Sequence, residues 1–286
     1  MKRLDRILTA ILIVFAVSGS LFAQEASDEE LAKKSQNPVG DIISIPIENN
    51  TYFDVGPSEE SANALFVKPV YPVRLGQINL INRLIVPLIH LEGQEFQVPA
   101  GSSGDVDLGT TSETVSLDSE FGLGNINYQA FFSPAEPGKV IWGVGPVIEF
   151  PTHTSDPLGS EKWSAGAGVV VLSMPKPWVL GVLIQNIWSF AGPDDEQDVD
   201  KFTLQYFINY NLGDGWYLST TPVITANWEA DSDDRWTVPF GFGLGRLVRI
   251  GKLPVDFKVQ AFTYVEKPDF GPDWSLQFQV KFLLPK

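Results

Sequence analysis

The chain has 286 residues, a formal net charge of −15 and no cysteine. Without cysteine it has neither a disulfide framework nor a cysteine-ligated metal site, and its two histidines lie far apart, so we expect no metal and no cofactor. The acidic balance leaves no basic patch to meet phosphates, so nucleic acid is excluded as an expected partner.

Residues 1–23 have the pattern of a secretory signal peptide. Three basic side chains at the start precede an apolar run over 7–17, and small residues lead to a cleavage point after Ala23. The run is shorter than the roughly 20 residues that span a bilayer, although an uncleaved anchor is the alternative. No later segment is a candidate transmembrane helix, because polar residues, glycine or proline interrupt every apolar run. An exported all-β chain of this kind is either soluble or an outer-membrane barrel.

The only convincing helical stretch is 25–36. Acidic residues come early in it, Lys33 and Lys34 come late, and Asn37-Pro38 ends it. We therefore predict a signal peptide over 1–23, a periplasmic N-terminal tail with a short helix over 24–41, and a barrel over 42–286. A plug in the barrel mouth is the alternative interpretation of the tail.

The clearest strand signal is a hairpin over 201–229. Apolar and polar side chains alternate along 201–212, with only Phe207 out of step, and alternate again along 216–229 after the turn Gly213-Asp214-Gly215. A period of two indicates strands, and arms of this length with aromatic ends are typical of transmembrane β-barrels. Repeats of this unit predict twelve strands, at 42–53, 63–74, 78–91, 120–133, 140–150, 163–174, 178–191, 201–212, 216–229, 236–248, 253–266 and 274–284.

The connections between these strands alternate strictly in length. The short ones are 75–77, 134–139, 175–177, 213–215 and 249–252, and the longer ones are 54–62, 92–119, 151–162, 192–200, 230–235 and 267–273. Short periplasmic turns and longer extracellular loops are the rule in outer-membrane barrels. We therefore predict an all-β, twelve-stranded antiparallel transmembrane β-barrel in the outer membrane of a Gram-negative cell, with both termini in the periplasm.

All eight tryptophans fall near strand ends, where aromatic girdles meet the two membrane interfaces. Beside the short turns lie Trp142, Trp178 and Trp216; near the long loops lie Trp163, Trp188, Trp228, Trp236 and Trp274.

Two features fit the barrel less well. Prolines lie inside the proposed strands and would mark bulges or kinks, since each removes a ladder hydrogen bond: Pro46, Pro69, Pro72, Pro87, Pro146, Pro222 and Pro239. Val179, Leu183 and Ile187 would face inward, which indicates either an apolar stretch of lumen or a wrong register.

Strand parity places charged and amide side chains in the lumen. An Arg or Lys facing hydrocarbon at mid-membrane costs roughly 2–4 kcal/mol, so inward placement is nearly forced. The lining candidates are Lys68, Arg83, Glu149, Gln185, Asp256, Lys258 and Lys281, with Glu266 on the same parity. Two interpretations stay open: paired charges that form a structural network, or a lining that sets selectivity.

The long loops offer less specific signals. Acidic runs at 194–200 and 231–234 are typical of solvated loops, although divalent cations could bridge them to lipopolysaccharide. The loop over 92–119 is interpreted as a mobile surface loop or, alternatively, as a gate folded into the lumen.

His153-Thr154-Ser155 resembles the His-x-Ser pair of outer-membrane phospholipases, which are also twelve-stranded. The histidine could activate the serine if a third group oriented its imidazole, but no Asn or Gln stands at a convincing position downstream. We therefore predict no catalytic residues and no enzymatic activity.

Several N-terminal blocks resemble one known family. They are Leu31-Ala32-Lys33-Lys34, the run from Gln36 to Pro46, Val67-Lys68-Pro69-Val70-Tyr71-Pro72, and Asn82-Arg83-Leu84-Ile85-Val86-Pro87. They are similar to a family of Gram-negative outer-membrane transport proteins associated with the meta-pathway of phenol degradation, whose members are often mislabelled neuromedin U. The resemblance implies an outer-membrane barrel with a transport role. It implies no particular substrate and no catalytic residues.

The first functional hypothesis is a channel or carrier for passive passage of small solutes, hydrophobic and aromatic ones included. The alternative is a structural outer-membrane barrel with a closed lumen, and a remote alternative is a membrane-embedded lipid hydrolase using His153 and Ser155. The expected partners are outer-membrane lipid, lipopolysaccharide, the barrel-assembly machinery and an unidentified small-molecule solute.

Overall fold

A computed structural model of the chain describes residues 28–99 and 112–284. The predicted signal peptide lies outside these described residues. Among them, the helices are too short or too polar to cross a membrane.

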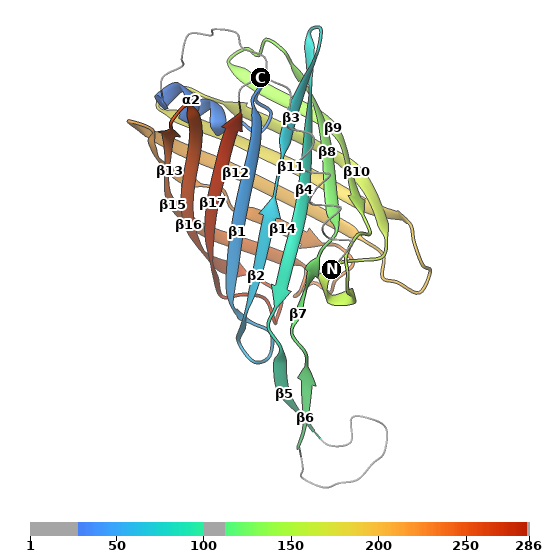
Figure 1. Cartoon of the computed structure of the whole chain (residues 1–286). Helices are drawn as coiled ribbons and strands as arrows, with labels where there is room; N and C mark the ends of the chain where they lie inside the picture. The colour runs from blue at the N-terminus through green and yellow to red at the C-terminus, as the bar shows by residue number, and fades with distance from the viewer. Residues whose placement is uncertain (1–27, 100–111, 285–286) are drawn as a thin grey trace.

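The strands form a closed antiparallel barrel (Figure 1). In chain order they are β1 (Ile43–Val55), β2 (Glu60–Val67), β3 (Val70–Leu75), β4 (Ile78–Leu91), β5 (Gln94–Pro99), β6 (Ser112–Leu117), β7 (Glu120–Leu123), β8 (Ile126–Pro134), β9 (Val140–Phe150), β10 (Trp163–Ser173), β11 (Trp178–Ala191), β12 (Asp200–Gly213), β13 (Trp216–Thr220), β14 (Val223–Asn227), β15 (Trp236–Ile250), β16 (Leu253–Glu266) and β17 (Trp274–Leu284). Fifteen of these segments belong to the barrel, and the pairing of β1 with β17 closes it. Because β2/β3, β7/β8 and β13/β14 each form one interrupted strand, the barrel has twelve strands, as predicted.

Proline accounts for two of the three interruptions. Pro69 separates β2 from β3 and Pro222 separates β13 from β14, while Pro239 lies at a register shift between β15 and β16. Proline has no N–H to donate to a ladder, so the wall bends or breaks at these positions. The prediction that strand prolines mark irregularities is confirmed at these three positions.

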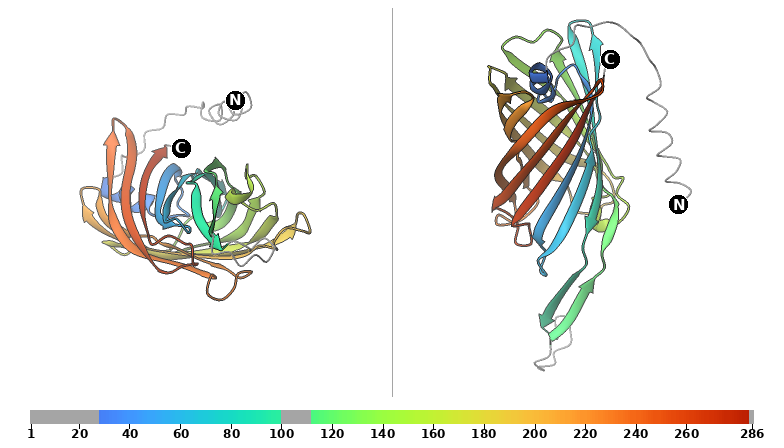
Figure 2. Two further views of the ribbon diagram at one scale, coloured as in Figure 1. Left: turned by 90° about the horizontal axis from the view of Figure 1, so that it is seen from below. Right: turned by 60° about the vertical axis from the view of Figure 1, so that its left-hand side comes forward.

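The two ends of the barrel differ. Short turns join strands at one end, which we call the turn end; the longer connections lie at the other, the loop end (Figure 1). The longest connection contains the hairpin β5–β6, which extends away from the barrel (Figure 2). This described part of the loop does not fold into the lumen, so the alternative of a lumen gate is wrong for it.

The interior is apolar on one side. Inward side chains of β4 and β8–β12 pack, together with Val39 from the segment before β1, into a buried cluster; its strand members are Ile81, Phe131, Ile141, Val170, Leu172, Val179, Leu183 and Phe207. Ile187 is also buried. The inward apolar residues of β11 therefore reflect an apolar stretch of lumen and not a wrong register, and Phe207 breaks the alternation of its strand because it joins this cluster.

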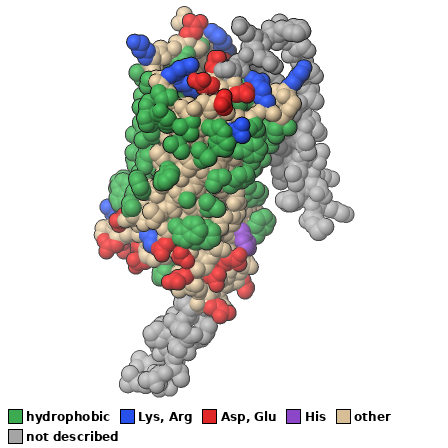
Figure 3. Space-filling model, turned by 90° about the vertical axis from the view of Figure 1, so that its left-hand side faces the viewer, with side chains coloured by type: hydrophobic (Ala, Val, Ile, Leu, Met, Phe, Trp, Pro, Cys, Tyr) green, Lys and Arg blue, Asp and Glu red, His purple; other side chains and the backbone are tan. Residues whose placement is uncertain are grey.

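The outer surface carries an apolar band between two charged ends (Figure 3). In this view most Lys and Arg lie toward the turn end, with several Asp and Glu beside them, whereas the loop end carries mostly Asp and Glu. The tryptophans stand near the strand ends as predicted, and several contact other rings: Trp274 stacks on Phe53 at 3.9 Å, and Trp228 meets Trp236 edge-on at 5.5 Å. Their role as interface anchors stays a prediction.

Candidate functional site in the barrel lumen

The helix α2 (Asp28–Ser35) lies at the turn end of the barrel (Figure 1). Its first turn is acidic, and a Glu30–Lys34 ion pair of 2.7 Å joins successive turns. Hydrogen bonding and charge from Lys34 hold the pKa of Glu30 below its ordinary value. The Asn37 side chain accepts the backbone N–H of Val39 at 2.9 Å, which turns the chain toward β1.

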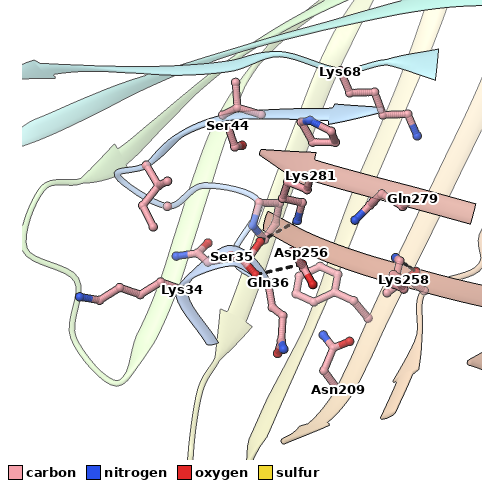
Figure 4. Close-up of a pocket in the computed structure, with 18 of the residues that line it drawn as sticks. Lys34, Ser35, Gln36, Ser44, Lys68, Asn209, Asp256, Lys258, Gln279 and Lys281 are labelled. Atoms are coloured by element: carbon pink, nitrogen blue, oxygen red, sulfur yellow. Dashed lines mark hydrogen bonds between the residues drawn. The ribbon is translucent and has the colours of Figure 1, made fainter. Parts of the chain in front are cut away.

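Residues 28–42, which we call the N-terminal plug, are bound to the barrel by polar contacts. Asp28 pairs with Arg249 at 2.6 Å at the rim. Deeper in the lumen, Ser35 Oγ donates to Asp256 at 3.1 Å and the Lys281 ammonium donates to the Ser35 carbonyl at 2.8 Å (Figure 4). These contacts tie one short segment to β15, β16 and β17.

Apolar contacts complete the docking of the plug. Ala32 is 1% exposed and packs against Leu247 and Leu283, and Val39 is 3% exposed within the apolar cluster of the lumen. Removing apolar side chains such as these from water contributes favourable free energy to the docking of the segment. This segment therefore packs into the barrel mouth. The arrangement corresponds to the alternative interpretation, a plug, and not to a periplasmic tail in solvent.

Two cavities follow one another along the lumen, on the loop-end side of the plug. The smaller, of about 140 Å³, is bordered by the plug itself, and the larger, of about 260 Å³, lies further toward the loop end. Five residues line both: Glu48, Lys68, Arg83, Gln205 and Thr221. We call this shared ring the lumen junction.

Charges at the junction and in the smaller cavity are only partly paired. Lys68 pairs with Glu48 at 2.6 Å, and Asn50 also donates to Glu48. Lys258 Nζ donates to the Thr221 hydroxyl at 3.0 Å. Asp256, 1% exposed, accepts the Tyr217 hydroxyl at 2.7 Å in addition to that of Ser35. Both carboxylates are therefore held by several donors.

Arg83 differs from the other charged groups of the lumen. Its Nη1 is buried without a hydrogen-bond partner, and its guanidinium lies 5.9 Å from the centre of the Phe131 ring. Within the described residues, no carboxylate lies within ion-pair distance of it. A buried polar group left without a partner in a native structure calls for an explanation.

The larger cavity reaches an irregular part of the wall. Pairing between β13/β14 and β15 stops at Ser219–Gly243 and resumes at Thr225–Thr237 in the same register, so positions 220–224 and 238–242 are unpaired with each other. Pro222, Val223 and Pro239 border the cavity here. We call this stretch the wall gap.

Six of the seven predicted lining residues border a cavity. Lys68, Arg83, Gln185, Asp256, Lys258 and Lys281 border one or both cavities. Glu149 borders neither cavity and pairs with Lys201 at 2.8 Å. Whether any of them sets selectivity stays a prediction.

Sequence reasoning missed Glu48, Tyr217 and Ser35. Parity along β1 points Glu48 inward with Ser44 and Asn50, so the same signal that selected Lys68 was present. Nothing in the sequence indicates that Ser35 would meet Asp256, because 221 residues separate them.

The His153-x-Ser155 pair has a different geometry from a nucleophile and its base. Ser155 Oγ donates to Glu120 at 3.1 Å, and the His153 ring contacts Asn125 at 3.1 Å. Asn125 precedes the pair in the chain and is therefore not one of the downstream positions at which a third group was expected. His153, Asp156 and Glu161 also bring one ligand atom each within 4.8 Å of one another, but such clusters are common on exposed loops and by themselves indicate no metal.

Comparison with known proteins gives the fold. No protein-family model and no curated protein sequence matches the chain. Among solved structures, an outer membrane channel from Pseudomonas putida F1 is similar with a TM-score of 0.62 and 14% identity, over 86% of this chain and 97% of that one. The NanC porin (TM-score 0.48, 7% identity, 85% and 100% coverage) and the CymD monoaromatic hydrocarbon channel (0.47, 10%, 94% and 95%) are more distant. At these identities the similarity shows a shared barrel fold, and the resemblance to the phenol meta-pathway family stays a prediction.

Proposed function

We propose that this protein is an outer-membrane channel or carrier for passive passage of small solutes, hydrophobic and aromatic ones included, with both termini in the periplasm. The observation that carries the proposal is the pair of cavities in series, joined at residues that line both. A barrel that served only as a scaffold would gain stability by filling this space, because protein interiors normally pack without large voids. The fold shared with an outer membrane channel supports the same conclusion.

The plug bears on the route of passage. It narrows the turn-end mouth, and its docking contacts also suit the alternative of a structural barrel with a closed lumen. For an apolar solute the wall gap offers a second route, since the larger cavity borders it and prolines keep its backbone unpaired. We propose that water-soluble solutes need the plug to move, whereas apolar solutes leave through the gap.

The test is transport by the chain from Gln24 onward and by a variant that lacks residues 28–42. Both are refolded, checked for β-rich circular dichroism, and measured in a planar bilayer for single-channel conductance and in liposomes for the rate of toluene uptake above that of protein-free liposomes. We expect small or rare conductance steps from the full chain, larger ones from the deletion variant, and toluene uptake by both. Folded protein of both kinds that shows neither conductance nor uptake would refute the proposal and favour the structural barrel.

The hydrolase alternative is tested separately. Lipid turnover in detergent micelles is compared between the chain and a Ser155→Ala variant. Because Ser155 donates to Glu120, we expect no turnover above background in either protein. Turnover that Ser155→Ala abolishes would overturn this expectation.

A further inference from the structure

The charge balance of the lumen is opposite to that of the whole chain. Two carboxylates, Glu48 and Asp256, border the cavities, against four cations that form no ion pair with an acid elsewhere in residues 28–99 and 112–284: Lys68, Arg83, Lys258 and Lys281. The lumen therefore carries a surplus of two positive charges in a chain whose formal net charge is −15. Lys34 also borders the smaller cavity, but its ammonium pairs with Glu30.

Among these four cations, Arg83 is set apart by a missing hydrogen-bond acceptor. Lys68 has Glu48, Lys258 has the Thr221 hydroxyl, and Lys281 has the Ser35 carbonyl, whereas the buried Nη1 of Arg83 has no acceptor. An uncompensated buried charge is unfavourable, and an anion that supplied the missing acceptors would relieve it. Arg83 borders both cavities, so an anion at the lumen junction would lie beside this side chain.

The surroundings of Arg83 indicate which kind of anion fits. A guanidinium presents parallel N–H donors that match a carboxylate, and the Phe131 ring near it favours the planar group staying in one orientation. On the loop-end side of the junction the larger cavity has apolar side chains beside amide and hydroxyl groups such as those of Gln129, Gln185 and Ser275; the apolar ones are Phe66, Ile85, Leu183, Val223 and Phe262. The site thus has a cationic end and an end that offers apolar contacts among polar groups.

We propose that Arg83, with Lys68 and Lys258 in the same cavity lining, binds the carboxylate of a small solute whose apolar or aromatic part occupies the larger cavity. This inference rests on the proposed function and names the class of solute: a small aromatic or aliphatic carboxylate. Inorganic phosphate shares the anionic chemistry but has no apolar part, so it would leave the larger cavity unfilled.

The test is isothermal titration calorimetry of the folded full-length mature chain in detergent with sodium benzoate, compared with neutral benzamide and with inorganic phosphate. We expect benzoate to bind and benzamide to bind at least about tenfold more weakly, since a charge-assisted hydrogen-bond pair is at stake. Arg83→Gln should weaken benzoate binding by about tenfold or more, and Arg83→Lys by less, because the charge stays and the fork is lost. Glu48→Gln should strengthen benzoate binding, because it removes a competing anion.

A matched control is Arg74→Gln, which removes an exposed arginine of β3 paired with Glu136 at 3.6 Å outside the cavities and should leave benzoate binding unchanged. Equal binding of benzoate and benzamide, or unchanged benzoate affinity in Arg83→Gln, would overturn the inference. Phosphate that binds as tightly as benzoate would also overturn it and leave a general anion site. If Arg83→Gln does not fold, the other two variants test the inference: Arg83→Lys should weaken benzoate binding and Glu48→Gln should strengthen it.

Binding and transport can fail independently. Arg83-dependent benzoate binding without solute passage would leave the binding site standing and refute the proposed function. Solute passage without Arg83-dependent benzoate binding would refute the binding site and leave the proposed function standing.

Discussion

Replacing Ser35 by alanine should loosen the N-terminal plug by a calculable amount. Its hydroxyl donates to the Asp256 carboxylate at 3.1 Å and to the Ala32 carbonyl at 2.8 Å. A hydrogen bond to a charged group contributes about 1.5–3 kcal/mol, and because one hydroxyl proton serves two acceptors we take the lower end, about 1.5 kcal/mol. Alanine is the better helix former by about 0.5 kcal/mol, which offsets part of the loss. The net cost to docking is about 1 kcal/mol, or about fivefold in the undocked population.

Thiol labelling measures this population directly, because the chain has no cysteine of its own. Val39→Cys places a thiol on the plug at a position that is 3% exposed, where a reagent reaches it only after undocking. With fast redocking the labelling rate follows the undocked fraction. Val39→Cys/Ser35→Ala should therefore label about fivefold faster than Val39→Cys alone.

The control is Ser173→Ala in the same Val39→Cys background. Ser173 lies on β10 near the turn end and donates to the Lys139 carbonyl at 3.0 Å, and neither residue borders the cavity at the plug. Its loss should not change the labelling rate. An unchanged rate in the Ser35 variant, or an equal rise in both variants, would refute the docking contacts as the cause.

Three further predictions concern the barrel itself. Gly245→Ala should destabilise the fold by about 1–3 kcal/mol in urea unfolding, because a Cβ there would overlap the Tyr217 ring. Phe131→Ala should cost about 3–5 kcal/mol in the same assay, since its side chain is 0% exposed in the apolar cluster. In the variant Val223→Cys/Pro239→Cys, oxidation of the two thiols to a disulfide should crosslink the wall gap. This should stop liposome uptake of toluene and leave ion conductance unchanged.

Each of these has an internal comparison. Gly138→Ala adds a Cβ with nothing within 4 Å and should be nearly neutral in urea unfolding. Phe132→Ala removes the outward neighbour of Phe131, 42% exposed, and should cost clearly less; equal costs would contradict the inward packing. For the wall gap the reduced protein is the control, and uptake that persists after complete crosslinking would exclude this route.

The strands could be predicted from the sequence because the membrane and the lumen impose opposite demands on alternate residues. β4, β9, β11, β16 and β17 begin and end at the predicted residues. The inward cations followed from the same parity. Contacts between distant parts of the chain could not be predicted, because alternation states which face a side chain takes and not which neighbour it meets.

The prolines show where this limit lies. The sequence marked Pro222 and Pro239 as irregular, each on its own strand. Only the register brings them together on the two sides of one gap, beside the larger cavity. The hairpin β5–β6 was missed for a different reason, since it lies beyond the barrel, where no membrane enforces a strong alternation.

The plug, the cation at the junction and the wall gap follow one another along the lumen, and their order constrains the route of passage. The plug borders the smaller cavity, Arg83 borders both, and the gap borders the larger. An amphipathic acid held by its carboxylate at Arg83 has its apolar part toward the gap, where exposed Phe240 and Phe242 continue the apolar surface outside. In the proposed function, undocking the plug opens a path for water-soluble solutes, whereas the wall gap admits only apolar groups. Plug deletion should therefore raise ion conductance more than toluene uptake, whereas gap crosslinking should lower toluene uptake and leave ion conductance unchanged, so the two perturbations together separate an aqueous route from a lateral one.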